Sequence, residues 1–418
     1  MQEVKQEYLY YTTDRGLHIV YIPAHSNVEY CGVDVAVGSR NELPQNYGIA
    51  HFIEHTLFKG TTNHAANYIA NRMEQVGGEL NAYTTKDETV IYSTFPKGNL
   101  SRAISLIADL LINSTFPEEQ LEREKAVVLD EIDSYRDSPA EAIYDDFEEN
   151  IFAGTPLAHN ILGTADTIKT FDSTICRQFL KKYYTSANMV FFYMGATPAK
   201  TVFRLVNRYF ASISTTGICG YNYEYNRKVL PSPFDKTEHI DTHQAHTIIG
   251  CRLPGINSPL RFPIALLTNI LGGPGMNARL NTILREQRGL VYTIEASTSF
   301  FNDCGELTIY FGCDSEDVER CKNLIIKEIN KFATTQMTKL QLDKARRQYL
   351  GQLIVASDNR EQLALSTAHE YLYNYLQNPS APSPVISHLD EINAITPQDI
   401  ISAAQIIAPS NLSTLTFK

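Results

Sequence analysis

The two halves of the sequence repeat one order of helix, glycine turn and strands, and this repetition limits the folds that the chain can adopt. The segment RMEQVGGELNAYT at residues 72–84 has a counterpart in LREQRGLVYTIEA at 284–296. The helical segment PEEQLEREKAVVLDEI at 117–132 has a counterpart in MTKLQLDKARRQYLGQL at 337–353. Repetition of a whole series of elements indicates a duplicated domain.

Each half is therefore expected to form an α+β domain, with a mainly antiparallel sheet packed against helices. A chain of 418 residues is too long for one hydrophobic core and suits two domains of about 200 residues each. We expect a first domain at 1–215, a polar, proline-containing linker at 216–236, and a second domain at 237–418.

Composition excludes several classes of protein. Apolar residues make up 43% and charged residues 20% of the chain, which is typical of a folded globular protein. The net charge of −11 argues against nucleic-acid binding, which needs an excess of lysine and arginine. No run of 18 apolar residues predicts a membrane span. The seven scattered cysteines include no C-x-x-C pair, and they favour reduced thiols and a cytoplasmic location.

The stretch GIAHFIEHTLFKGT at residues 48–61 contains the strongest chemical signal. His51 and His55 are four residues apart, so a helix places both on one face, where they can bind one metal ion. Glu54 lies to one side of the helix face that His51 and His55 share, and it is better placed to act on a metal-bound water. This H-x-x-E-H pattern is the signature of inverzincin metallopeptidases. The competing interpretation is a chance grouping of side chains on an ordinary helix.

The expected helix at 117–132 argues against a chance grouping of these side chains. Its expected inward face carries Glu124 and Glu131 among apolar residues, and a buried carboxylate is costly unless it has a partner. The matching face in the second half has Ala345 and Gln352 in their place. The second half also has FPIALLTNIL where the first has AHFIEHTLF. The histidines and glutamates are thus present together in one half and absent together from the other, which packing does not explain.

These residues carry a family resemblance that covers essentially the whole chain. The segments HFIEHTLFKGT, EREKAVVLDEI and LREQRGLVY resemble those of the insulinase/pitrilysin zinc peptidases, and the length is most similar to the mitochondrial-processing-peptidase-like branch. The resemblance implies a Zn2+ ion held by His51, His55 and Glu131. It implies that Glu54 is the general base and that Glu124 is a carboxylate that supports the catalytic site.

The resemblance also implies residues that contact the substrate. The segment ELNAYTT resembles an exposed edge strand along which a peptide pairs as an added strand, with Asn81, Ala82 and Thr84 lining the cleft. In the second half, Arg285 and Tyr292 match residues that reach the substrate near the metal. The alternatives are an ordinary sheet strand, a surface arginine and a core tyrosine.

We therefore expect a zinc endopeptidase that hydrolyses peptides or unfolded segments enclosed in a clamp of two domains. Two alternatives stay open: a processing-peptidase-like subunit that works in a heterodimer, and a non-enzymatic assembly protein with structural zinc. The expected partners are a polypeptide substrate and a second subunit, in a homodimer or a heterodimer, with no nucleic acid and no membrane.

Overall fold

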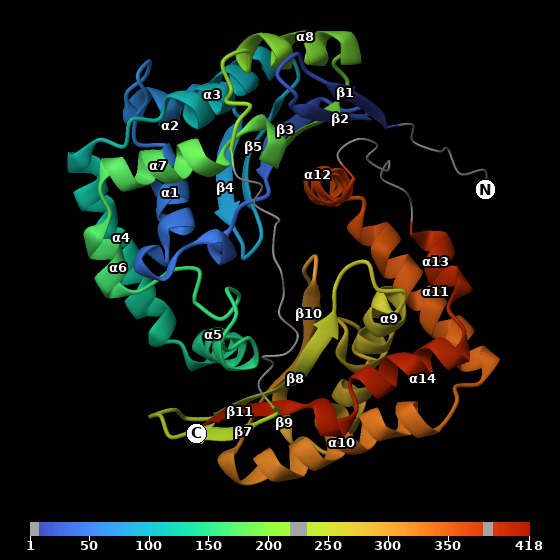
Figure 1. The fold of residues 1–418 in the computed structure, drawn as a ribbon. Helices are drawn as coiled ribbons and strands as arrows, with labels where there is room; N and C mark the ends of the chain where they lie inside the picture. Colours follow the sequence, from blue (N-terminus) through green and yellow to red (C-terminus); the bar gives the residue numbers. More distant parts are fainter. Residues whose placement is uncertain (1–7, 218–231, 379–387) are drawn as a thin grey trace. The chain divides into compact units, whose positions relative to one another are not determined.

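The structure, a computed structural model, describes residues 8–217, 232–378 and 388–418 (Figure 1). The described chain forms two compact units. The first contains residues 8–133, 159–217 and 357–378, and the second contains 134–158, 232–356 and 388–418. Among the described residues, no helix is long and apolar enough to cross a membrane.

The first unit is built on a six-stranded sheet in the order β1-β2-β6-β3-β5-β4. Neighbouring strands are antiparallel, except that β2 and β6 are parallel. β4 lies at one edge of the sheet, with β5 as its neighbour. The strands are β1 (Leu9–Thr12), β2 (His18–Pro23), β3 (Val28–Val35), β4 (Glu79–Thr84), β5 (Thr89–Pro96) and β6 (Met189–Gly195).

A layer of helices covers one face of this sheet and encloses the main core of the unit. In α1, Phe52, Ile53 and Leu57 are fully buried because their spacing places them on the side that faces the strands. The helices of this layer are α1 (Ile49–Leu57), α2 (Ala66–Glu74), α3 (Leu100–Asn113), α4 (Glu118–Arg136), α6 (Ala165–Thr170), α7 (Ser173–Tyr183) and α8 (Ala199–Tyr209).

The opposite face of the same sheet is covered by one helix from late in the chain, α12 (Arg360–Gln377). Ala364, Ala368 and Leu372 recur every four residues and form its apolar stripe, which packs on side chains of β2 and β6. The short alanine side chains let the helix lie close to the strands.

The second unit contains a five-stranded sheet in the order β7-β11-β8-β10-β9. Its neighbouring strands are antiparallel, except that β7 and β11 are parallel. One face packs against a layer of helices. The strands are β7 (Asp235–Glu238), β8 (Ala245–Pro254), β9 (Val291–Phe300), β10 (Cys304–Cys313) and β11 (Ser413–Phe417). The helices are α9 (Arg261–Gly272), the π-helix η5 (Asn281–Glu286), α10 (Val318–Thr334), α11 (Lys339–Ala356), α13 (Leu389–Ala394) and α14 (Pro397–Ile406).

The other face of the second sheet is covered by α5 (Pro139–Ile151), which comes from the first half of the chain. Phe147 of this helix lies over Gly250 of β8. A Cβ atom at Gly250 would stand 2.9 Å from the Phe147 ring and 2.1 Å from the Leu307 carbonyl oxygen. The glycine therefore allows the close approach of helix and strand.

The predicted α+β fold with two similar domains is confirmed, since each unit has one sheet, one helix layer and one helix on the far face. The compact units differ from the continuous ranges 1–215 and 237–418, because α5 belongs to the second unit and α12 to the first. Each helix follows its apolar stripe onto the sheet of the other half. Most of the linker expected at 216–236 lies outside the described residues.

Candidate active site

The N-terminus of α1 is held by a buried carboxylate from the preceding loop. Both oxygens of Glu42 accept backbone hydrogen bonds, from the N–H of Gly48 and the N–H of Ala50, each at 2.7 Å. A carboxylate at this end satisfies free N–H groups and complements the helix dipole. The ring of His159 lies 3.0 Å from the same carboxylate, and Tyr47 stacks on that ring. These contacts fix the start of the helix that carries the two histidines.

His51, His55 and Glu131 converge in the first unit. The Nε2 atoms of His51 and His55 lie 3.8 and 3.5 Å from Oε2 of Glu131. One donor atom from each residue lies within 4.8 Å of the others. The predicted helical spacing is confirmed, because α1 supplies both imidazoles and α4 supplies the carboxylate. Two nitrogen donors and one oxygen donor at this separation are the ligands that zinc accepts in catalytic sites.

The protonation of His51 suits a metal ligand. Burial, together with the neighbouring His55, lowers the pKa of His51 to about 3, so its ring is neutral at pH 7. A neutral imidazole offers a lone pair to a cation, whereas an imidazolium does not. The residues present therefore fit a zinc ion.

Glu124 contacts the second histidine. Its Oε1 lies 3.1 Å from Nδ1 of His55, and its Oε2 lies 2.7 Å from Nζ of Lys59. A carboxylate at Nδ1 favours the tautomer with the proton on that nitrogen, which leaves Nε2 free to bind a metal. The predicted supporting place of Glu124 agrees with this geometry, and its role in catalysis stays a prediction.

Glu54 lies between the two histidines in sequence and outside the group of three donors in space. Burial raises the pKa of the Glu54 carboxyl to about 7, an effect that His55 and the Thr84 hydroxyl oppose and that Glu131 reinforces. Helix α1 contacts the edge strand β4, so Glu54 lies near Thr84 at the end of that strand.

The three residues predicted to line the cleft lie on β4. Asn81 is exposed, whereas Ala82 and Thr84 are partly buried. Because β4 pairs only with β5, its outer edge has no strand partner within the described sheet. This strand has the backbone arrangement that an added peptide strand requires.

The two substrate-contact residues predicted in the second half are both at the surface of the second unit. Tyr292 has an exposed fraction of 59%, and its hydroxyl donates a hydrogen bond of 2.8 Å to Asp314. Arg285 belongs to η5 and lines a pocket of about 320 Å3 with the glycine-rich segment at 272–275. The alternative of a core tyrosine is excluded by this exposure, while contact of either residue with substrate stays a prediction.

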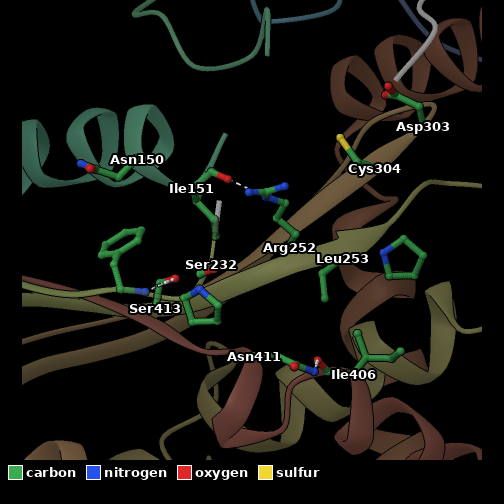
Figure 2. Close-up of a pocket in the computed structure, with 13 residues that line it drawn as sticks. Asn150, Ile151, Ser232, Arg252, Leu253, Asp303, Cys304, Ile406, Asn411 and Ser413 are labelled. Carbon is green, nitrogen blue, oxygen red and sulfur yellow. Dashed lines mark hydrogen bonds between the residues drawn. The ribbon is translucent and has the colours of Figure 1, made fainter. Parts of the chain in front are cut away.

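A separate pocket of about 440 Å3 lies in the second unit and contains no candidate metal cluster (Figure 2). Its wall includes Arg252, whose Nε donates a hydrogen bond to the carbonyl of Ile151 at the end of α5. Among the described residues, both groups of metal-binding side chains lie in the first unit. The candidate metal ligands among the described residues therefore all belong to the first unit.

Sequence reasoning missed Lys59 and Glu42. Lys59 is four residues beyond His55, and this helical spacing could have indicated a basic partner for the predicted carboxylates. Glu42 had no comparable signal, because it reaches α1 through a loop whose path no periodicity shows.

Comparison with known proteins agrees with this geometry. Residues 19–165 match the model described as Insulinase (Peptidase family M16), and residues 172–349 match the Peptidase M16 inactive domain. An uncharacterized zinc protease of Bacillus subtilis is 30% identical over 355 residues, which cover 84% of each chain. An uncharacterized zinc protease of Rickettsia bellii is 31% identical, over 90% of this chain and 91% of the relative.

Solved structures share the fold. A protease from Helicobacter pylori has a TM-score of 0.90 at 22% identity, covering 99% of both chains. A peptidase M16 inactive domain from Pseudomonas fluorescens has a TM-score of 0.86 at 18% identity, covering 98% of this chain and 97% of the other. The chain thus belongs to the insulinase family of zinc peptidases, peptidase family M16, as a protease with zinc as its cofactor.

Proposed function

We propose that the protein is an endopeptidase in which His51, His55 and Glu131 hold the zinc ion and Glu54 is the general base. The observation that supports this most strongly is the convergence of one donor atom from each of the three ligands within 4.8 Å, with Glu54 beside them and outside their set. Structural zinc sites normally take four protein ligands, whereas three leave a position for catalysis. The alternative of a structural zinc is therefore disfavoured.

Each side chain of this site has a separate role in the proposed reaction. Zinc, when bound, supplies a Lewis acid that polarises a carbonyl and lowers the pKa of water. Glu54 accepts a proton from the attacking water and returns it to the leaving amine. Glu124 holds the His55 ring in one orientation, and Lys59 balances the charge of Glu124.

The substrate binds as an extended polypeptide along β4. Backbone pairing with an edge strand requires no particular side chains and needs an unfolded segment, so peptides and disordered regions are the expected substrates. Asn81, Ala82 and Thr84 then contact the substrate. Because Thr84 is the last residue of β4, a peptide paired along this strand ends near Glu54. A strand that continues on both sides of the cleaved bond makes the enzyme an endopeptidase. Contacts from Arg285 and Tyr292, the processing-peptidase-like branch, a second subunit and a cytoplasmic location stay predictions.

Mass-spectrometric mapping of cleavage sites in a peptide library tests this function. We expect internal cleavage that stops in the presence of a chelator and returns when zinc is added. The Glu54→Gln variant, prepared in the same way, controls for contaminating peptidases. Cleavage that persists in the chelator, or that removes only terminal residues, would contradict the proposal.

A further inference from the structure

Three ionisable side chains meet on the face of the first sheet that lies under α12. They come from separate elements: Asp34 from β3, Glu88 from the turn before β5, and His369 from α12. One donor atom from each lies within 4.8 Å of the others, a limit that His51, His55 and Glu131 also meet. Residues distant in sequence thus supply a set of one nitrogen and two oxygen donors.

Asp34 is the residue that needs an explanation. Side chains alternate along β3, so Val33 and Val35 enter the main core and Asp34 points to the opposite face. Its exposed fraction is 1%, and the one side chain that hydrogen-bonds with it among the described residues is a second carboxyl group, that of Glu88. A buried carboxylate without donors is strongly unfavourable unless a proton or a cation neutralises it.

Glu88 increases this requirement. It is a second buried carboxylate, with an exposed fraction of 7%, and one of its oxygens contacts Nδ1 of His369. The preceding residue, Asp87, pairs at 2.9 Å with Arg40. Two carboxylates at this separation repel each other when both are charged. The pair therefore shares a proton, pairs with a protonated His369, or binds a metal ion.

We propose that Asp34, Glu88 and His369 form a second site for a divalent transition cation, separate from the catalytic zinc. An imidazole with two carboxylates suits ions of the zinc and manganese type. The His369 side chain is 32% exposed, which gives an ion a route from solvent. The site lies on the face of the sheet opposite the layer that contains α1 and α4.

The second cation stabilises the packing of α12 on the first sheet. The helix already contacts the sheet through its apolar stripe, and Glu361 accepts a hydrogen bond of 2.7 Å from Thr94. An ion held by all three ligands joins β3, the turn before β5 and α12. Binding to the folded state alone stabilises the protein, so the cation secures the helix on this sheet.

Equilibrium dialysis of the full chain against Zn2+, with metal counted by mass spectrometry, tests the site. We expect about two equivalents in the wild type, about one in His55→Ala, about one in Asp34→Asn, and close to none in the double variant. Glu361→Gln, on the same helix and outside the cluster, is the matched control and should keep about two.

Several outcomes would overturn the proposal. One equivalent in the wild type and none in His55→Ala would show that no metal ion binds the cluster and that protons neutralise it. An unchanged count in Asp34→Asn, or an ion retained by the double variant, would place the second cation elsewhere. If Asp34→Asn fails to fold, the count in His55→Ala decides alone, because that variant leaves the proposed site intact.

Discussion

The same contact between two helices is built from different chemistry in the two units. In the first, α1 and α4 meet through the imidazoles of His51 and His55 and the carboxylate of Glu131. In the second, α9 and α11 meet through a neutral amide pair, in which Asn269 donates a hydrogen bond of 2.9 Å to Gln352. The second unit shows that this packing needs neither a charge nor a metal. The ionisable groups of the first unit are therefore explained by chemistry and not by folding.

The second helix of each pair shows a further difference seven residues, or about two turns, towards its N-terminus. Glu124 on α4 is buried and contacts His55, whereas Ala345 is in the matching position of α11. A carboxylate with no imidazole to orient would only add a desolvation penalty. The loss of this residue together with the ligands is consistent with its proposed role of supporting the site.

The largest effect is expected from Glu131→Gln. An amide is a much weaker zinc ligand than a carboxylate, so the variant should lose zinc and peptidase activity by more than the roughly 100-fold typical of supporting residues. Zinc content and turnover of the purified variant measure this directly. Near-normal zinc binding would show that Glu131 is not a ligand.

Tyr292→Phe tests whether the second unit contributes to catalysis. If its hydroxyl donates to the substrate as negative charge develops on the carbonyl, kcat should fall by roughly 10- to 1,000-fold with zinc content unchanged. Because the hydroxyl now donates to Asp314, Asp314→Asn is a useful companion that should keep most activity. Wild-type kcat in Tyr292→Phe would restrict catalysis to the first unit.

Glu124→Gln should weaken zinc binding by roughly 10- to 100-fold, the range for partners that orient a ligand. The amide can still accept a hydrogen bond from Nδ1 of His55, but it lacks the charge that favours this tautomer. Competition with a chelator of known affinity gives the change. An unaltered affinity would indicate that the contact between Glu124 and His55 is only structural.

The smallest effect is expected from Gln352→Leu in the second unit. The hydrogen bond to Asn269 contributes about 1 kcal/mol to the free energy of unfolding, and the site contains no catalytic group. Urea denaturation should detect this loss, while zinc content and kcat stay at the wild-type level. A large loss of activity would contradict the claim that the contact between α9 and α11 is only structural.

Local spacing made much of the site predictable. His51 and His55 share a helix face because four residues make about one turn, and Glu124 and Glu131 were noticeable as carboxylates on an apolar stripe. The exchange of α5 and α12 between sheets was not predictable, since an apolar stripe shows that a helix packs without showing on which sheet. Alternation along β3 is also typical of a strand with one solvent face, so it does not indicate that Asp34 is buried.

If Glu54 is the general base and not a ligand, its substitution separates metal binding from proton transfer. We predict that Glu54→Gln keeps one zinc ion at the catalytic site and loses peptidase activity by at least roughly 100-fold, the lower range for removal of a general base. Zinc content and turnover should be measured on one preparation, beside Glu131→Gln. Loss of zinc from Glu54→Gln as readily as from Glu131→Gln, or turnover at the wild-type rate, would contradict the assignment of base and ligand.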